Sequence, residues 1–288
     1  MKRIFLLTVV LIAFWLLPTI AFSQPIKKIL TIDNAIPYIK TISTERKIDR
    51  TFVKRVRNDN FRKKINRNYL EVVDHKYYKL GYSENHEIAG WVAYLLTKEM
   101  VLERNAERRN NFKADRKVST GSAQSGDYKH SGYDRGHICP SADMSFSQEA
   151  QNLTFLMSNI APQLHSFNAG KWHELEKKVR EWAVENDSII VISGALFDSI
   201  ITIIGQKNRV SVPYRFYKVI IDISYPSYKA IGFVMENKNL REDIFHYSMS
   251  LEDLEALTGM IFFPDFPLSK SIINLKNSCS IWDWERND

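Results

Sequence analysis

A series of short strand-like runs most constrains how this chain of 288 residues can fold. The runs are rich in β-branched and aromatic residues and are separated by glycine, proline and asparagine. They span residues 89–97, 188–193, 210–212, 217–223 and 230–235. With helices inserted among them, this pattern predicts an α+β fold built on a central antiparallel sheet.

Two segments carry a helical pattern. Residues 168–184 place apolar side chains at three- and four-residue steps, namely Trp172, Leu175, Val179 and Ala183. Residues 251–258 read as a later helix that Gly259 stops. We therefore expect helices that bury one face against the sheet.

One short stretch concentrates reactive side chains. Asp134, Arg135 and His137 stand within four positions, between and beside Gly132 and Gly136. The glycines predict a shaped turn rather than a regular strand or helix. A neutral histidine can take a proton from water near pH 7, and an arginine offers a planar fork that suits a phosphate. The alternative is a surface turn whose histidine is hydrogen-bonded and inert.

Two further blocks follow this stretch in the sequence. Asn-Ile-Ala-Pro-Gln begins at Asn159, and Asn-Ala-Gly-Lys-Trp-His-Glu-Leu-Glu runs from Asn168 to Glu176. Together with Asp-Arg-Gly-His, these blocks resemble the DNA/RNA non-specific endonuclease family, the sugar-non-specific nucleases related to mitochondrial endonuclease G. The resemblance extends more faintly from about Tyr77 to Pro264.

The resemblance implies the ββα-metal (His-Me finger) nuclease fold and hydrolysis of phosphodiester bonds in DNA, RNA or both, with little sequence preference. This reaction needs a base for water and charge near the phosphate and the leaving oxygen. His137 is the expected general base. Arg135 matches the family's phosphate-facing arginine.

A divalent ion is also implied, and oxygen ligands suit Mg²⁺, with Mn²⁺ or another divalent cation as a substitute. Asn168 matches the family's single direct ligand, although asparagine is also a favoured helix N-cap and both roles can coincide. Glu176 lies about 12 Å further along a helix, so we expect it to act on the metal through water. Its alternative role is a helix pair with Arg180.

Three neighbouring residues receive supporting roles. Arg180 lies one turn beyond Glu176 and is expected to help bind the substrate. Asn159 is interpreted as a substrate-binding residue that supports the site from a strand end. Asp134 is interpreted as a structural hydrogen-bonding residue of the turn. A competing zinc set of His137, Cys139, His165 and His173 matches no common zinc spacing and would consume the proposed base.

Residues 1–23 read as a signal peptide, because Lys2 and Arg3 precede an apolar run and small residues follow it. This predicts an exported protein, periplasmic or secreted, without stable membrane association after cleavage. The alternative is an uncleaved anchor. Export also favours a disulfide between Cys139 and Cys279, with two free thiols as the alternative.

The positive charge is concentrated in one part of the chain. Residues 25–67 hold 13 Lys and Arg against four Asp and Glu, whereas the whole chain nets +7. We therefore divide the mature chain into a basic arm, residues 24–69, and a nuclease domain, residues 70–288. The arm either packs on the domain as a solvated basic helix or follows a nucleic-acid backbone.

Two functions remain at this point, and the oligomeric state stays open. The first is a metal-dependent endonuclease. The second is a catalytically inactive nucleic-acid-binding protein of the same fold. The second would require a broken base or metal ligand, yet His137, Asn168 and Glu176 are all present.

Overall fold

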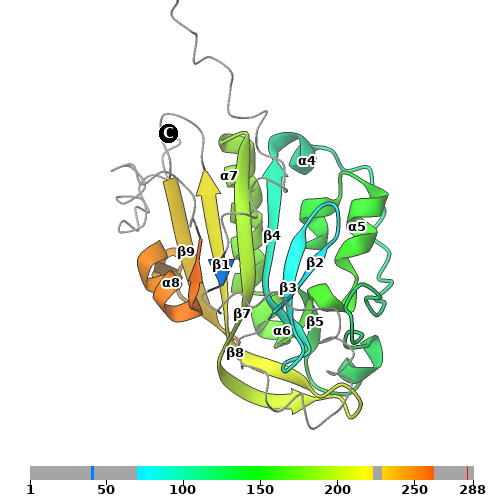
Figure 1. The fold of residues 1–288 in the computed structure, drawn as a ribbon. Helices are drawn as coiled ribbons and strands as arrows, with labels where there is room; N and C mark the ends of the chain where they lie inside the picture. Colours follow the sequence, from blue (N-terminus) through cyan, green and yellow to red (C-terminus); the bar gives the residue numbers. More distant parts are fainter. Residues whose placement is uncertain (1–39, 42–69, 223–228, 263–283, 285–288) are drawn as a thin grey trace, which may run out of the picture.

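The computed structural model describes residues 40–41, 70–222, 229–262 and 284. Its largest element is a seven-stranded antiparallel sheet in the order β10-β9-β8-β7-β4-β3-β2 (Figure 1). The strand bounds are β2 Glu71–Asp74, β3 Lys79–Ser83, β4 Ile88–Thr97, β7 Ser188–Ile204, β8 Val210–Asp222, β9 Lys229–Glu236 and β10 Ser248–Met249. This arrangement confirms the expected α+β fold around a central antiparallel sheet.

Both faces of the central strands are buried, and alternate residues serve opposite faces. In β4, Val92 and Tyr94 belong to one hydrophobic core, whereas Trp91 and Ala93 belong to another. The same alternation runs through β7 and β8. The sheet is therefore the middle layer between two coverings.

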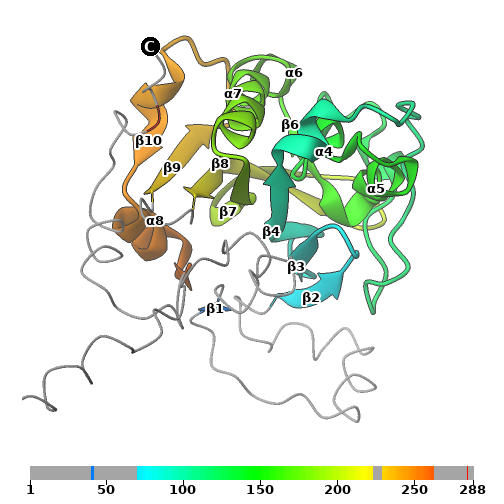
Figure 2. The same ribbon diagram turned by 90° about the horizontal axis from the view of Figure 1, so that it is seen from above.

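The helices supply those coverings, as the view from above shows (Figure 2). One face packs against α7 Lys171–Glu185, with α4 Lys98–Leu102 and α5 Gln148–Thr154 beside it. The opposite face packs against α8 Leu251–Thr258. Ser250 caps the start of α8 by accepting a hydrogen bond from the backbone of Asp253, and Gly259 ends the helix at φ 68°. The predicted bounds of this helix are confirmed.

A second, two-stranded sheet corrects the expected turn at Asp134. Strand β5, Asp134–His137, pairs antiparallel with β6, Ile160–Gln163. The glycines still matter locally. Gly132 has a φ of 82°, and a Cβ on Gly136 would lie 2.0 Å from the Gln163 side chain. The reactive stretch is a strand because a partner that is distant in the sequence supplies its hydrogen bonds.

The helix expected over residues 168–184 is also corrected, since a break divides it. The short helix α6, His165–Asn168, precedes α7, which begins only at Lys171. Gly170 is the N-cap of α7, with φ −96° and ψ −122°, and a Cβ there would lie 2.2 Å from the Ser166 carbonyl oxygen. Asn168 is thus the last residue of α6 and not the N-cap of α7.

Two strands predicted separately form one. Residues 210–212 and 217–222 both belong to β8, which continues through Pro213, and the predicted end at residue 223 lies outside the described residues. Pro213 pairs with Ile200, where the register between β7 and β8 shifts. A proline lacks the N–H that a regular ladder uses, so irregular pairing accommodates it.

Most of the predicted N-terminal regions lie outside the described residues. This holds for the signal segment 1–23 and for the arm 24–69 except β1, Lys40–Thr41, which pairs with β11, Met260–Ile261. Within the described part, no helix is long and apolar enough to span a bilayer.

The centre of the sheet has no room for one extra methyl group at Gly194. A Cβ there would lie 2.0 Å from the Gly90 carbonyl oxygen of the adjacent strand. We expect Gly194→Ala to lower the free energy of unfolding by about 3 kcal/mol, because the backbones must separate. Urea unfolding measures this, with Gly126→Ala as the control, since a Cβ at Gly126 meets nothing within 4 Å. An equal midpoint for both variants would contradict the expected clash.

Candidate functional site

An open pocket of about 650 Å³ lies where β5, α6 and the chain around Phe112 meet. Its lining includes Arg108, Phe112, Lys129, Asp134, Arg135 and Asn168. Arg135 and Asn168, predicted as site residues from two separate sequence blocks, therefore line one hollow. Positive side chains outnumber the single carboxylate in this set.

Arg135 presents its guanidinium on the exposed side of β5. Its Nη1 donates a hydrogen bond to Ser125 Oγ at 2.7 Å, and its Cζ lies 4.5 Å from the centre of the Phe112 ring. Stacking on an aromatic face holds the guanidinium plane in place and leaves its remaining N–H donors free. The side chain is thus oriented and still open to an anion.

His137 lies two residues further along β5 and so on the same face as Arg135. Its ring centre is 5.7 Å from that of Phe112 and 4.9 Å from that of Phe155, which meets it edge-on. Its Nε2 is buried and has no hydrogen-bond partner among the described residues. Burial, helped by the positive charge of Arg108, lowers the pKa of His137 to about 3. The imidazole is therefore neutral at pH 7.

Asp134 connects two residues of α6. Its Oδ2 accepts a hydrogen bond from Asn168 Nδ2 at 2.9 Å and lies 2.9 Å from Nδ1 of the exposed His165. With the Asn168 amide nitrogen engaged, its oxygen has no hydrogen bond among the described residues. An amide oxygen beside a carboxylate is a donor set that suits a hard divalent cation.

Glu176 and Arg180 do not line this pocket. Glu176 is mostly buried on α7, and its carboxylate lies 3.7 Å from His173 Nδ1. Arg180 instead donates to Asp143 Oδ1 at 2.8 Å, and Tyr94 donates to the other oxygen at 2.7 Å. Asp143 is fully buried, and burial raises its pKa although Arg180 opposes that shift. The phosphate-binding role of Arg180 stays a prediction that this pairing does not support.

Asn159 lies at the strand end, where its amide bonds to the protein backbone. Its side chain is fully buried, and its Oδ1 accepts a hydrogen bond from the backbone N–H of Cys139 at 2.8 Å. Its Nδ2 donates to the carbonyl oxygens of Cys139 and Thr154 at 3.0 and 2.9 Å. Its amide nitrogen is therefore fully used within the protein, and the substrate-binding role of Asn159 stays a prediction that this placement does not support. Asn159 instead fastens the backbone immediately after β5.

Cys139 is a free thiol among the described residues, so its disulfide with Cys279 stays a prediction. Its side chain is completely buried in the core, and burial raises the thiol pKa well above its usual range. Cys279 lies outside the described residues. Within the described part of the chain, no three His, Cys, Asp or Glu side chains cluster to hold a metal ion, so His137, Cys139, His165 and His173 form no zinc set there.

Sequence reasoning missed Arg108 and Phe112. Arg108 lines the pocket and stacks over Phe155 at 5.6 Å, close enough to depress the pKa of His137. Phe112 touches both Arg135 and His137. The sequence feature that could have identified Arg108 is the arginine-rich run at residues 104–109. This run shows neither helical nor strand periodicity, as expected of a loop.

Comparison with known proteins identifies relatives of most of the described region. A model of the family described as DNA/RNA non-specific endonuclease matches residues 57–269. "Nuclease EXOG, mitochondrial" from Danio rerio is 32% identical over 223 residues, covering 72% of this chain and 65% of the relative. A "Nuclease" from Nostoc sp. is 32% identical over 209 residues, covering 68% of this chain and 73% of the relative.

A crystal structure of the EndoG/EndoGI complex matches with a TM-score of 0.64 and 31% identity, covering 68% of this chain and 86% of that chain. This match confirms the ββα-metal fold. The chain spans only 58% to 65% of the length of three EXOG relatives. The family match begins at residue 57, inside the arm predicted for 24–69, so the boundary at residue 70 stays a prediction.

The relatives overturn the expected localisation. The EXOG relative, and others named "Nuclease 1, mitochondrial" and "Mitochondrial nuclease", are assigned to mitochondria by their names. The expectation of an exported, periplasmic or secreted protein is therefore wrong on this comparison. Hydrophobicity shows that residues 4–17 are apolar, but it does not identify the compartment that receives the chain.

The depressed pKa of His137 makes stability depend on pH. Its folded pKa of about 3 lies below the ordinary 6.5, so the unfolded chain takes up the proton first as pH falls. The contribution is fully present above pH 6.5 and is lost progressively towards pH 3. Between pH 7 and 5 we expect His137 to account for up to about 2 kcal/mol of lost stability.

Urea unfolding in EDTA measures this loss for the wild type and for His137→Gln, which cannot titrate there. The variant should lose less stability between pH 7 and 5 than the wild type. Equal losses would show that the folded protein protonates His137 as easily as the unfolded chain does.

Proposed function

The chain belongs to the DNA/RNA non-specific endonuclease family, and from this premise we propose that it is a metal-dependent endonuclease that hydrolyses phosphodiester bonds of DNA or RNA with little sequence preference. One observation carries the proposal. His137 has a neutral, partly exposed ring on the strand face that also presents Arg135, and its Nε2 has no hydrogen-bond partner among the described residues.

His137 acts as the general base that takes a proton from the attacking water. Its low pKa keeps the ring unprotonated and ready to accept at neutral pH. A base whose pKa stayed that low throughout the reaction would be weak. A phosphate anion bound beside the ring favours the imidazolium form, so substrate binding strengthens the base when it is needed.

Arg135 binds the phosphate through its fork, and Arg108 adds a second positive charge at the same pocket. Both guanidiniums stack on phenylalanine rings and therefore lose little freedom when the phosphate arrives. Contacts to phosphate do not distinguish bases, which supports cleavage with little sequence preference.

Asn168 would hold one Mg²⁺ through its amide oxygen, while Asp134 fixes the orientation of that amide. Glu176 would orient water on the ion from α7. When bound, the ion supplies charge stabilisation at the phosphate and at the leaving oxygen. Mn²⁺ or another divalent cation can replace it, since the donors are oxygens.

A nicking assay on supercoiled plasmid tests the function directly. We expect cleavage in Mg²⁺ and none in excess EDTA. The competing function, a catalytically inactive nucleic-acid-binding protein of the same fold, predicts a gel shift of intact plasmid under both conditions. Intact plasmid in Mg²⁺ and Mn²⁺ would reject the endonuclease.

His137→Ala should lower kcat by about 10²- to 10⁴-fold, because proton transfer by a positioned base contributes that much. Mg²⁺ binding, followed by thermal shift, should be nearly unchanged, since Asn168 remains. His246→Ala is the matched control, because His246 is exposed on the 3₁₀ helix Ile244–Tyr247 and lines neither described pocket. Activity of His137→Ala within a few-fold of the wild type would reject the assignment of the base.

Asn168→Ala should shift the Mg²⁺ dependence of the rate to higher concentration while DNA binding in EDTA changes little. Excess Mg²⁺ should restore part of the rate if the ion still enters with its waters. Ser166→Ala, an exposed position in the same helix, controls for changes in α6. A metal titration that superimposes on the wild type would assign Asn168 a purely structural role.

A further inference from the structure

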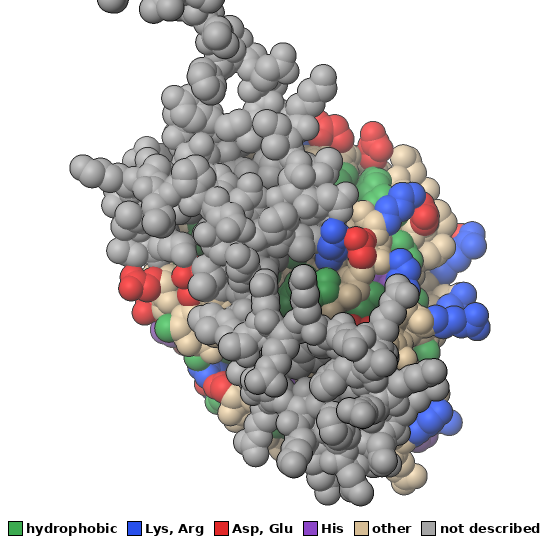
Figure 3. Space-filling view, in the orientation of Figure 1, with side chains coloured by type: hydrophobic (Ala, Val, Ile, Leu, Met, Phe, Trp, Pro, Cys, Tyr) green, Lys and Arg blue, Asp and Glu red, His purple; other side chains and the backbone are tan. Residues whose placement is uncertain are grey.

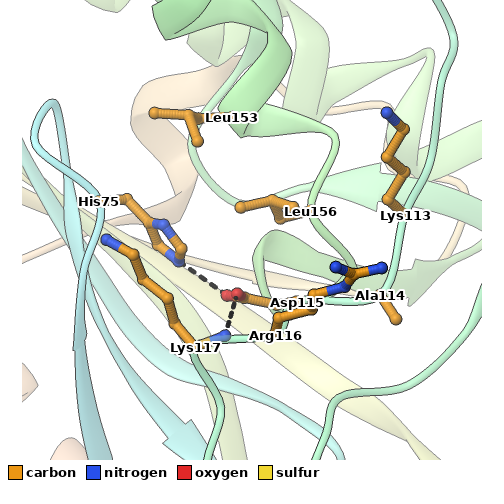
Figure 4. A pocket seen from close by; sticks show the side chains of 8 residues that line it. All are labelled: His75, Lys113, Ala114, Asp115, Arg116, Lys117, Leu153 and Leu156. Carbon is orange, nitrogen blue, oxygen red and sulfur yellow. Dashed lines mark hydrogen bonds and ion pairs between the residues drawn. The ribbon is translucent and has the colours of Figure 1, made fainter.

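A second pocket of about 640 Å³ is lined by the chain that directly follows Phe112, from Lys113 to Lys117, together with His75, Leu153 and Leu156 (Figure 4). We propose that it is a subsite for one nucleotide of the substrate strand, next to the two nucleotides whose phosphodiester bond is cleaved. This rests on the proposed nuclease function. The pocket holds no residue assigned above to the reaction.

The floor of the pocket is a fixed polar network. His75 Nε2 lies 2.7 Å from Asp115 Oδ2, and Ser158 donates to the same oxygen at 2.6 Å. All three side chains are buried. Burial would raise the pKa of Asp115, but these hydrogen bonds outweigh it and lower that pKa. The one carboxylate of the pocket is therefore already partnered and does not repel an anion at the rim.

The walls and the rim have different chemistry. Leu153 and Leu156 form apolar, partly exposed walls, which suit a sugar or the face of a base. Lys113 and Arg116 are exposed at the rim, and neither has an ion-pair partner among the described residues. Figure 4 shows their side chains around the hollow, opposite His75. An apolar cleft with free cations at its edge complements a nucleotide.

The two pockets share their dividing wall. Phe112 touches Arg135 and His137, whereas the next residue, Lys113, lines the second pocket. Likewise Phe155 touches His137, while Leu156, the next residue, and Leu153, two residues before it, line the second pocket. Lys113 N–H donates to the Phe155 carbonyl at 3.1 Å, which ties the two segments together.

The residues that line the two pockets lie close together along the chain. An extended chain spans at most about 3.6 Å per residue, so Phe112 and Arg116 are within about 14 Å of each other. The space-filling view shows Lys and Arg side chains on the face of the molecule near α5, with some acidic side chains among them (Figure 3). Proteins that bind single strands combine such basic side chains with surfaces on which the bases pack.

The test compares Lys113→Ala/Arg116→Ala with Lys177→Ala/Arg241→Ala, a control of equal charge change at exposed positions that line neither described pocket. Binding of a labelled single-stranded oligonucleotide of about 12 nucleotides is followed by fluorescence anisotropy in EDTA. Cleavage of the same strand is followed in Mg²⁺. A third variant, Ala114→Glu, places a carboxylate at the exposed rim without disturbing the core.

We expect the pocket variant to raise Kd and KM about tenfold relative to the control, with kcat within about twofold. The slope of log K against log salt should flatten by about 0.7 for each phosphate of the single strand that the variant no longer neutralises. Ala114→Glu should weaken binding in the same direction. Together these results would establish the subsite.

Equal Kd and salt slope for the pocket and control variants would overturn the subsite. So would a fall in kcat with unchanged Kd, since the cations would then act on the reaction and not on the strand. Lower thermal stability with unchanged Kd would mean that the pocket packs against this chain's own residues, and would also overturn it. If the wild type cleaves nothing in Mg²⁺, the nuclease proposal fails, while the anisotropy result still decides whether the pocket binds a strand.

Discussion

The side-chain amide of Asn159 joins the end of β5 to the chain that leaves α5. Its three hydrogen bonds go to backbone groups of Cys139 and Thr154, all within the protein interior. A buried backbone group that lost its partner would cost about 1–3 kcal/mol, so this connection strongly favours one arrangement. His137 lies two residues before Cys139, and the position of its ring between Phe112 and Phe155 depends on that anchor.

A second constraint acts on α7 from the sheet. Trp172, Glu176 and Arg180 follow one another at four-residue steps and so share one face of the helix. Arg180 is held by Asp143, and the ammonium of Lys218 on β8 lies 4.6 Å from the centre of the Trp172 ring. Burial lowers the pKa of Lys218, although the charge of Glu176 opposes the shift. These buried contacts fix the rotation of α7 about its axis. They therefore also fix the direction in which α7 presents the Glu176 carboxylate.

Local sequence rules were sufficient where a structure depends on neighbours in the chain. The bounds of α8 follow from a capping serine and a terminal glycine, both of which act within one helical turn. The sequence predicted β4 from its apolar and aromatic composition, because a strand that is buried on both faces consists of a nearly continuous apolar run. The three motif blocks likewise contained Arg135, His137 and Asn168 without any knowledge of the fold.

What the sequence by itself determined, then, is the α+β class and the family, and it also supplied the prediction of which side chains react. Tertiary structure alone decided that Asp134–His137 is a strand, since its partner β6 is distant in the sequence. It also decided that Asn159 is buried, that Arg180 pairs with Asp143, and that Arg108 reaches the pocket. The physical reason is the same in each case. Burial and pairing depend on which distant segments meet, and a residue's type and its immediate neighbours do not contain that information.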